Sequence, residues 1–267
     1  MDVHSVSLRG KRNQNEDKHN IILNIDGKNK DLSEINFFGV YDGHGGKFVS
    51  KFLEKNMPTF FMDKRLKYPL KRSFIYTIYT HLQKLLSDKF REFANHCGST
   101  CLIVTHFKVD NQSFLNIMNS GDSRCVLCRD NLAIALTKDH KPMWPEEKRR
   151  IEQLGGNIYY DGSDYRIKDL SVSRAFGDLD AHPYLTNIPD IFRYKIENTD
   201  KFIVMACDGL WDVMSNSDVV NFILNECYDK NLENRINVGT NIAKKLAETA
   251  IAKGSMDNVS IIIIFFK

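Results

Sequence analysis

The sequence predicts an α+β fold in which antiparallel sheets pack between helices. Strand-like and helix-like segments occur in separate runs, without the strand–helix–strand alternation that a parallel sheet needs. The length of 267 residues and the hydrophobic share of 42% suit one large domain. Two strands, 37–41 and 202–207, are unbroken apolar runs that lead directly into Asp42 and Asp208. Such runs are typical of strands buried on both faces.

The first half of the chain contains strand-like segments separated by a helical region. Apolar residues in the longer of two predicted helices recur every three or four positions, which favours core packing over a cofactor site. An Asp-Gly pair at Asp26-Gly27 indicates a turn. We expect strands at 3–9, 20–25 and 35–41, helices at 47–60 and 71–95, and strands at 100–109, 113–119 and 124–129.

The second half contains a hairpin, three helices and two long strands. Pro145 opens a helix that Gly155-Gly156 closes, because proline suits a first turn and glycine a helix end. Asp161-Gly162 follows a mixed polar segment and indicates a turn. The remaining predicted elements are a hairpin turn at 129–131, strands at 132–136, 202–207 and 259–266, and helices at 217–227 and 235–253.

Charge and cysteine content exclude several classes of protein. The 37 basic and 34 acidic residues give a net charge of +3, which is too even to indicate nucleic acid or an anionic membrane as partner. Cys125 and Cys128 have the spacing of half a zinc site, but residues three apart on a strand point to opposite faces. No signal peptide or membrane-length segment occurs, so we expect the protein in the cytoplasm, the nucleus or both. We also expect a monomer.

Acidic residues recur where the predicted strands begin or end. Besides Asp42 and Asp208, Asp257-Asn258 directly precede the last strand, Glu16-Asp17 follow the first one, and Asp139 follows the strand at 132–136. A carboxylate at the mouth of a buried strand is costly unless it is hydrated, paired or bound to metal. Carboxylate and carbonyl oxygens suit Mg²⁺ or Mn²⁺ rather than zinc. The pattern therefore predicts an acidic cleft for divalent cations, which can activate a water for phosphoryl transfer.

Three further residues beside these acids have suitable chemistry. The guanidinium of Arg12 can bind phosphate oxygens in bidentate fashion. His44 can donate a proton to a leaving alkoxide near neutral pH. Gly43 lets its backbone approach closely, so that its carbonyl can point inward. Taken singly, Arg12 would be read as a surface charge and His44 as a loop histidine.

A series of short motifs extends over nearly the whole chain. They are Arg12-Asn-Gln-Asn-Glu16-Asp17, Val40-Tyr41-Asp42-Gly43-His44-Gly45-Gly46, Gly98-Ser99-Thr100, Asn119-Ser-Gly-Asp122-Ser-Arg124, Asp139-His140-Lys141-Pro142, Val172-Ser173-Arg174-Ala175-Phe176-Gly177-Asp178, Ala206-Cys-Asp208-Gly-Leu-Trp-Asp212-Val213 and Asp257-Asn258-Val259-Ser260. In this order they resemble the metal-dependent protein phosphatases, the type 2C serine/threonine phosphatases. One motif alone would be a weak signal, but the ordered set is specific.

The resemblance implies a sandwich of two antiparallel sheets flanked by pairs of helices, and hydrolysis of phosphoserine and phosphothreonine on proteins. It also implies two Mg²⁺ or Mn²⁺ ions and a weaker third. By position, Asp42 would bridge the two ions, and Gly43 would serve one of them through its carbonyl. The resemblance assigns the other metal to Asp208 and Asp257, phosphate binding to Arg12 and proton donation to His44. Glu16 and Asp17 would either hold metal-bound waters or lie behind the metal ligands. Asp139 would serve the third metal, with Asp212 nearby.

One segment departs from the family pattern. Relatives usually carry Arg-Val-x-Gly-x-Leu before Val-Ser-Arg, whereas this chain has the shorter Arg166-Ile-Lys-Asp-Leu170 without the glycine. This region forms a flap beside the active site in the family, so the departure concerns substrate choice.

Two other functions compete with an active phosphatase. A catalytically inactive relative that serves as a binding module would be expected to lack a metal acid, yet Asp42, Asp208 and Asp257 are all present. A two-metal hydrolase for nucleic acid or small phosphates is disfavoured by the even charge.

Overall fold

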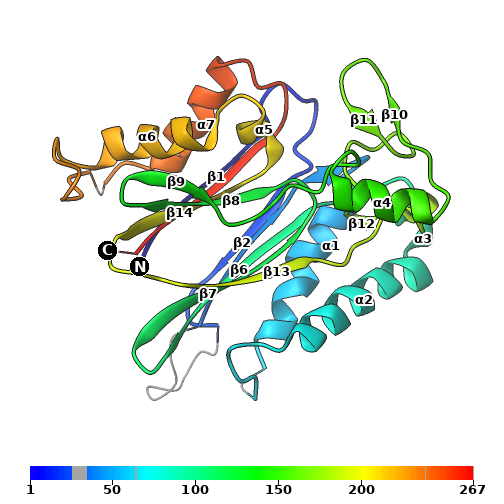
Figure 1. The fold of residues 1–267 in the computed structure, drawn as a ribbon, viewed down its shortest axis with the longest axis horizontal. Helices are drawn as coiled ribbons and strands as arrows, with labels where there is room; N and C mark the ends of the chain where they lie inside the picture. The colour runs from blue at the N-terminus through cyan, green and yellow to red at the C-terminus, as the bar shows by residue number, and fades with distance from the viewer. Residues whose placement is uncertain (26–34, 64, 238, 267) are drawn as a thin grey trace.

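Two five-stranded antiparallel sheets lie face to face, and helices cover both outer faces (Figure 1). The computed structural model describes residues 1–25, 35–63, 65–237 and 239–266. The first sheet has the order β1 (Asp2–Leu8), β15 (Val259–Phe265), β14 (Asp200–Ala206), β8 (Arg124–Arg129) and β9 (Leu132–Ala135). The second has the order β13 (Asp190–Lys195), β7 (Gln112–Ser120), β6 (Cys101–Val109), β3 (Asn36–Tyr41) and β2 (Lys18–Ile22).

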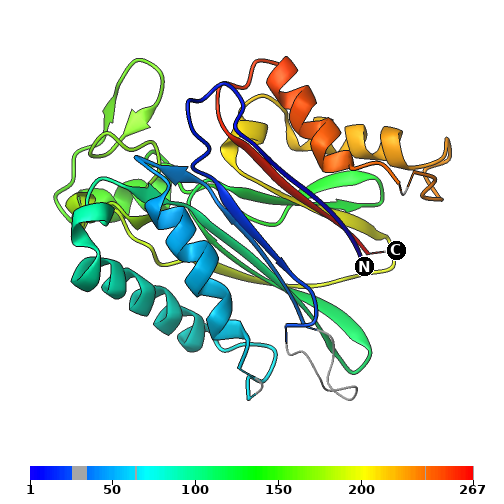
Figure 2. The same cartoon turned by 180° about the vertical axis from the view of Figure 1, so that it is seen from behind.

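The helices form a layer on each side of the sandwich. Figure 2 shows the pair α1 and α2 on the outer face of the second sheet, and the pair α6 and α7 on the outer face of the first. The predicted sandwich with flanking helix pairs is therefore confirmed. The helices are α1 (Phe48–Asn56), the 3-10 helix η1 (Met57–Phe61), α2 (Arg72–Lys89), α3 (Arg91–Ala94), α4 (Pro145–Gln153), η2 (Leu179–Ala181), α5 (Asp208–Trp211), α6 (Asn216–Cys227) and α7 (Ile242–Ala252).

Three layers of apolar side chains hold this sandwich together. One lies between the sheets and includes Phe38 and Ile262; the other two lie between a sheet and its helix pair. Alternation along a strand decides which layer a side chain enters. Cys125 packs between the sheets and Cys128 packs under α6 and α7, so the prediction that these two sulfurs diverge is confirmed. Burial of whole strands on both faces explains the unbroken apolar run of β15.

Short strands complete the end of the sandwich that carries the acids. A small sheet of β12 (Phe176–Gly177), β5 (Gly98–Ser99) and β4 (Gly43–His44) joins three distant segments. A separate hairpin of β10 (Tyr159–Tyr160) and β11 (Tyr165–Arg166) projects beside α4 in Figure 1. Its turn contains Asp161-Gly162, as predicted, with Asp161 Oδ1 accepting from the amides of Ser163 and Asp164.

Several predicted boundaries are wrong. The helix expected at 235–253 begins at Ile242, because Asn241 caps it by accepting from the amide of Lys244. The helix expected at 71–95 ends at Lys89, where Phe90 leaves helical geometry and α3 follows. Strand β13 was not predicted. The turn expected at Asp26-Gly27 lies outside the described residues. No helix within the described ranges has both the length and the apolar character needed to cross a membrane.

Candidate active site

Acidic side chains from four segments meet at one end of the sandwich. Asp42 follows β3, Asp122 lies between β7 and β8, and Asp208 is the first residue of α5, directly after β14 and Cys207. One carboxylate oxygen from each of these three acids lies within 4.8 Å of the others. A second group within the same limit contains Asp17, Asp42 and the sulfur of Cys207. Asp42 belongs to both groups, so it lies at the centre of the site.

Close backbone packing brings the acidic segments together. A Cβ on Gly209 would lie 2.0 Å from the carbonyl oxygen of Asn258, so glycine is required where the segments of Asp208 and Asp257 meet. Thr100, between β5 and β6, fixes the backbone of Asp42: the Asp42 amide donates to Thr100 Oγ1 at 3.1 Å, and the Thr100 amide donates to the Asp42 carbonyl at 2.9 Å.

Close backbone packing also explains why a glycine occupies position 43, next to Glu16. A Cβ on Gly43 would lie 2.4 Å from the carbonyl oxygen of Glu16, so a larger residue would push these segments apart. The Glu16 carboxylate accepts from the amide of Gly46 at 3.2 Å, and the Glu16 amide donates to Asn258 Oδ1 at 2.8 Å. Both Gly43 and Glu16 line the cavity at the centre of the site.

The electrostatics of this cluster favour a cation. Burial, followed by the charge of Asp208, raises the pKa of Asp42 well above its usual range. Burial and then the charge of Asp122 do the same to the pKa of Asp208. Burial raises the pKa of Asp17 to about 6. Its Oδ2 atom is buried and has no hydrogen-bond partner in the described part of the chain. Like charges this close are costly without a counterion, and the hard oxygen donors fit a divalent metal.

A cavity of about 630 Å³ opens over the acids. Asp42, Asp122, Asp208 and Asp257 line it, and Arg12 and His44 lie at its wall. This volume is within the range of small-molecule and cofactor sites. It leaves room for a phosphorylated side chain beside the carboxylates.

The two predicted catalytic side chains are both engaged with carboxylates. Arg12 donates from Nε and NH2 to the two oxygens of Asp257, at 2.9 and 2.5 Å, while its side chain remains 60% exposed. His44 Nε2 lies 2.7 Å from Asp178 Oδ2. Burial lowers the pKa of His44, but the charge and hydrogen bond of Asp178 outweigh burial and raise it. A raised pKa keeps more of the imidazole in its protonated form near neutral pH.

Asp139, predicted to serve a weaker third metal, forms an ion pair with Arg124 in the structure. Its two carboxylate oxygens accept from Arg124 at 3.0 and 2.7 Å, and Arg124 also lies over the ring of Trp211. The acid that joins Asp42 and Asp208 is Asp122. Sequence reasoning missed this role, although Asp122 lies two residues after the end of β7 and the other acids also lie next to strand ends.

Lys141 and Asp212 flank this part of the cluster. Lys141 Nζ lies 2.5 Å from Asp122 Oδ2, and together with nearby acids this contact raises the pKa of Lys141 despite burial. Asp212 follows α5, and burial raises its pKa, with Asp122 among the charges that add to the effect. Lys141 therefore offsets part of the negative charge around Asp122.

The shortened flap segment closes as a tight turn. Ile167 and Leu170 exchange backbone hydrogen bonds at 3.0 and 2.9 Å around Lys168 and Asp169, both with positive φ. Two such residues form the turn type that matches strand twist, usually with asparagine, aspartate or glycine. Arg166 donates to the Asp169 carbonyl at 2.7 Å, and both residues line the cavity. The chain thus forms this turn without a glycine.

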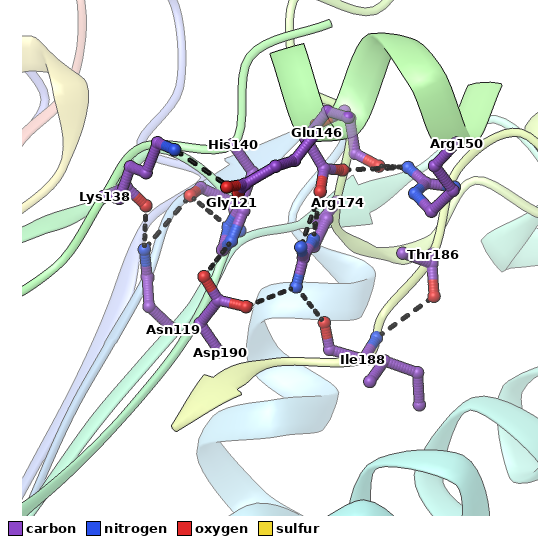
Figure 3. Close-up of polar contacts among 12 residues, drawn as sticks. Asn119, Gly121, Lys138, His140, Glu146, Arg150, Arg174, Thr186, Ile188 and Asp190 are labelled. Atoms are coloured by element: carbon purple, nitrogen blue, oxygen red, sulfur yellow. Dashed lines mark hydrogen bonds and ion pairs between the residues drawn. The ribbon is translucent and has the colours of Figure 1, made fainter. Parts of the chain in front are cut away.

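A polar network connects helix α4 and strand β13 with the loop between β7 and β8, which carries Asp122 (Figure 3). Arg174 donates to Glu147 at 2.9 and 2.5 Å and to Asp190 at 2.9 Å. Asp190 lies 3.3 Å from His140 Nε2, and His140 Nδ1 lies 3.1 Å from the amide of Gly121, the neighbour of Asp122. Helix α4, strand β13 and the loop of Asp122 are therefore held by one network of hydrogen bonds and ion pairs.

Fold and site together define a hydrolase whose acidic cluster is built for metal. A model of the protein phosphatase 2C family matches residues 1–259. PP2C-like domain-containing protein R307 of Acanthamoeba polyphaga mimivirus is 49% identical over 168 residues, which are 57% of this chain and 94% of that protein. Probable protein phosphatase 2C 71 of Arabidopsis thaliana is 34% identical over 98% of this chain, which spans 54% of that protein's length.

Solved structures agree with this family. A C. elegans sex determining protein superposes with a TM-score of 0.84 at 25% identity, over 100% of this chain and 65% of that one. Serine-threonine phosphatase 2C from Toxoplasma gondii has the same fold, with a TM-score of 0.79 at 24% identity over 99% and 94% of the two chains. The chain belongs to the protein phosphatase 2C family. It is a metal-dependent serine/threonine protein phosphatase, and its substrates are phosphoproteins.

Proposed function

We propose that this phosphatase uses a pair of Mg²⁺ or Mn²⁺ ions held by Asp42, Asp208, Asp257 and the carbonyl of Gly43. The observation that supports this most strongly is the membership of Asp42 in both groups of possible ligand atoms, one with Asp122 and Asp208 and the other with Asp17 and Cys207. We assign a further ion to Asp122 rather than to Asp139, because Asp122 lies beside Asp42 and Asp208 whereas Asp139 is paired with Arg124. When bound, such ions supply an activated water and stabilise the charge of an in-line phosphoryl displacement.

The chain's own residues perform the other tasks of the reaction. Arg12 is exposed at the cavity wall, and its guanidinium can share its donors between Asp257 and a phosphate oxygen. His44 donates the proton that the leaving serine or threonine oxygen needs. Glu16 and Asp17 support the waters of the metal site from the side of β2. We infer that residues 1–267 act as one catalytic domain, because acids from both ends of the sequence line one cavity.

The experiment is a phosphate-release assay on a phosphothreonine peptide, with Mn²⁺ and with EDTA. We expect activity that requires the metal and that falls to background in Asp208→Asn. Asp88→Asn serves as the matched control, because Asp88 is an exposed acid of α2 that pairs with Lys84. Activity that survives EDTA, or an Asp208→Asn variant as active as the control, would remove the mechanism.

A second assay isolates His44. We expect His44→Ala to reduce hydrolysis of the phosphothreonine peptide by about 10²-fold or more, the lower end of general-acid contributions. The same variant should retain most activity on para-nitrophenyl phosphate, because nitrophenolate leaves without a proton. Equal losses on the two substrates would contradict the proton-donor role.

The inactive-module alternative finds no support in the site. The metal acids that an inactive relative would be expected to lack, Asp42, Asp208 and Asp257, all line the cavity. Release of phosphate in the assay with Mn²⁺ would exclude the inactive module directly.

A further inference from the structure

We propose that Asp178 is a positioning residue for His44: it holds Nε2 of the imidazole so that Nδ1 faces the leaving oxygen of the substrate. This inference rests on the proposed role of His44 as proton donor. The two side chains come from segments 134 residues apart and meet at 2.7 Å between Nε2 and Oδ2. The Asp178 side chain is 2% exposed, whereas His44 is 30% exposed and lines the cavity. A buried carboxylate thus anchors a ring whose other edge is accessible.

The small sheet at the site is built around this contact. His44 in β4 pairs with Gly98 in β5, and Gly98 pairs with Gly177 in β12, so Asp178 follows directly. A Cβ on Gly98 would lie 2.0 Å from Asp178 Oδ2 and 2.5 Å from His44 Nε2. Real side-chain atoms do not approach this closely, so Gly98 leaves space for the hydrogen bond. The space for this hydrogen bond explains why residue 98 is a glycine, although its φ angle does not require one.

The backbone that presents Asp178 is fixed from helix α2. The amide of the buried Gln83 side chain donates to the Gly177 carbonyl at 2.9 Å and accepts from the Gly177 amide at 3.0 Å. The amide of Asp178 donates to the Cys97 carbonyl at 3.1 Å. Gly177 and Asp178 both have positive φ, at 78° and 44°. Left-handed geometry at a residue other than glycine is unfavourable and needs support from its surroundings.

The proton balance of the step is simple. The bond between phosphorus and the leaving oxygen breaks, and its electron pair stays on that oxygen. The proton on His44 Nδ1 moves to this oxygen and completes the alcohol, while Nε2–H remains bonded to Asp178. His44 is then neutral, and it regains a proton from solvent, which also receives the proton lost by the attacking water. Asp178 keeps its charge throughout and touches no reacting atom.

The test compares substrates that do and do not need the proton. Asp178→Gly suits the left-handed backbone and removes the carboxylate. We expect it to lower kcat on the phosphothreonine peptide by about 10- to 100-fold, part of the 10²–10⁴-fold that a general acid contributes. Activity on para-nitrophenyl phosphate should change by less than about threefold, which also shows that the site has folded. Asp178→Asn, whose amide oxygen can accept the same hydrogen bond, should recover part of the loss.

A matched control lies two residues away. Asp180 forms the corresponding pair with His96, at 3.1 Å, but there the side chains are 40% and 78% exposed. Asp180→Gly should leave the ratio of the two activities unchanged. In the double variant of His44→Ala with Asp178→Gly, we expect no loss beyond that of His44→Ala, because Asp178 acts through His44.

Each outcome decides the question. Equal losses on both substrates in Asp178→Gly, or additive losses in the double variant, would show that Asp178 supports the site in some other way. If Asp178→Gly does not fold, Gln83→Leu, which releases the clamp on Gly177, must show the same selective loss, and an unselective loss overturns the proposal. Failure of the proposed function is distinguishable, because wild-type protein would then release no phosphate with Mn²⁺.

Discussion

Replacing Glu147 with glutamine should destabilise the protein far more than the same change at its neighbour Glu146. Glu147 on α4 is 3% exposed and accepts from both Arg174 and Arg150, at distances between 2.5 and 2.9 Å. Arg150 also donates to the carbonyls of Ser173 and Tyr184. The carboxylate therefore neutralises two guanidinium groups that bind the backbone between Ser173 and Ile188. Glu146 is 73% exposed and makes one contact, with Lys138 at 3.3 Å.

The expected size follows from the pKa of Glu147. Burial opposes ionisation, but the hydrogen bonds and charges of Arg174 and Arg150 lower the pKa from 4.5 to about 2. That difference corresponds to about 3 kcal/mol of stability for the ionised group. Breaking a buried ion pair by removing one partner costs a similar amount, about 3–5 kcal/mol. We therefore expect Glu147→Gln to lose about 3 kcal/mol at pH 7, and Glu146→Gln less than about 0.5 kcal/mol.

The pH dependence gives a sharper test. A carboxylate whose pKa is depressed by folding stabilises the protein fully above its unfolded pKa, and this stabilisation is lost as pH falls toward the folded pKa. The difference in the free energy of unfolding between wild type and Glu147→Gln should shrink from about 3 kcal/mol at pH 7 to about 2 kcal/mol at pH 3.5. Urea unfolding followed by fluorescence measures both values. Equal destabilisation by the two variants, or a difference that does not decline with acid, would refute the reasoning.

Three further predictions concern the site. Asp208→Asn should raise the stability of the metal-free protein at pH 7. Burial and the charge of Asp122 raise the pKa of Asp208, so that its ionised form is unfavourable in the folded state. A lower midpoint of urea unfolding in EDTA for this variant than for wild type would contradict the prediction. Asp122→Asn should weaken activation by Mn²⁺ in a titration of phosphatase activity. Asp139→Asn should leave this activation unchanged and lower the melting temperature. If Asp139→Asn weakened activation more than Asp122→Asn did, the third-metal role predicted for Asp139 would be supported instead. Gly98→Ala should reduce phosphothreonine hydrolysis about as much as loss of the proton donor, because its Cβ would displace Asp178, and full activity of this variant would count against that packing.

Local patterns in the sequence were sufficient to predict antiparallel sheets packed between helices and acids at the strand ends, whereas the two-sheet sandwich was predicted from the resemblance of the motifs to a known family. Apolar runs identified the buried strands, and the acids next to them were the ones that could meet at one edge. The start of α7 was predicted too early, since the apolar pattern of 235–253 hid the capping role of Asn241. Strand β13 was missed because its exposed and half-buried residues alternate weakly.

The parts of the site that were missed depend on contacts between distant segments. Asp139 and Asp122 both lie beside strand ends, and only the tertiary position of Arg124 shows that Asp139 is engaged elsewhere. The pairing of His44 with Asp178 depends on three short strands and on the missing side chain of Gly98. No periodicity in the sequence reports such a contact, although Gly98 and Asp178 both lie within motifs typical of the family.

Anomalous X-ray scattering from a crystal soaked in Mn²⁺ tests the central claim most directly, because it locates the metal independently of activity. We expect manganese peaks in contact with the carboxylate of Asp42, with Asp208 and Asp257 among the other ligands. Well-ordered carboxylates with no manganese peak beside Asp42 would contradict the account.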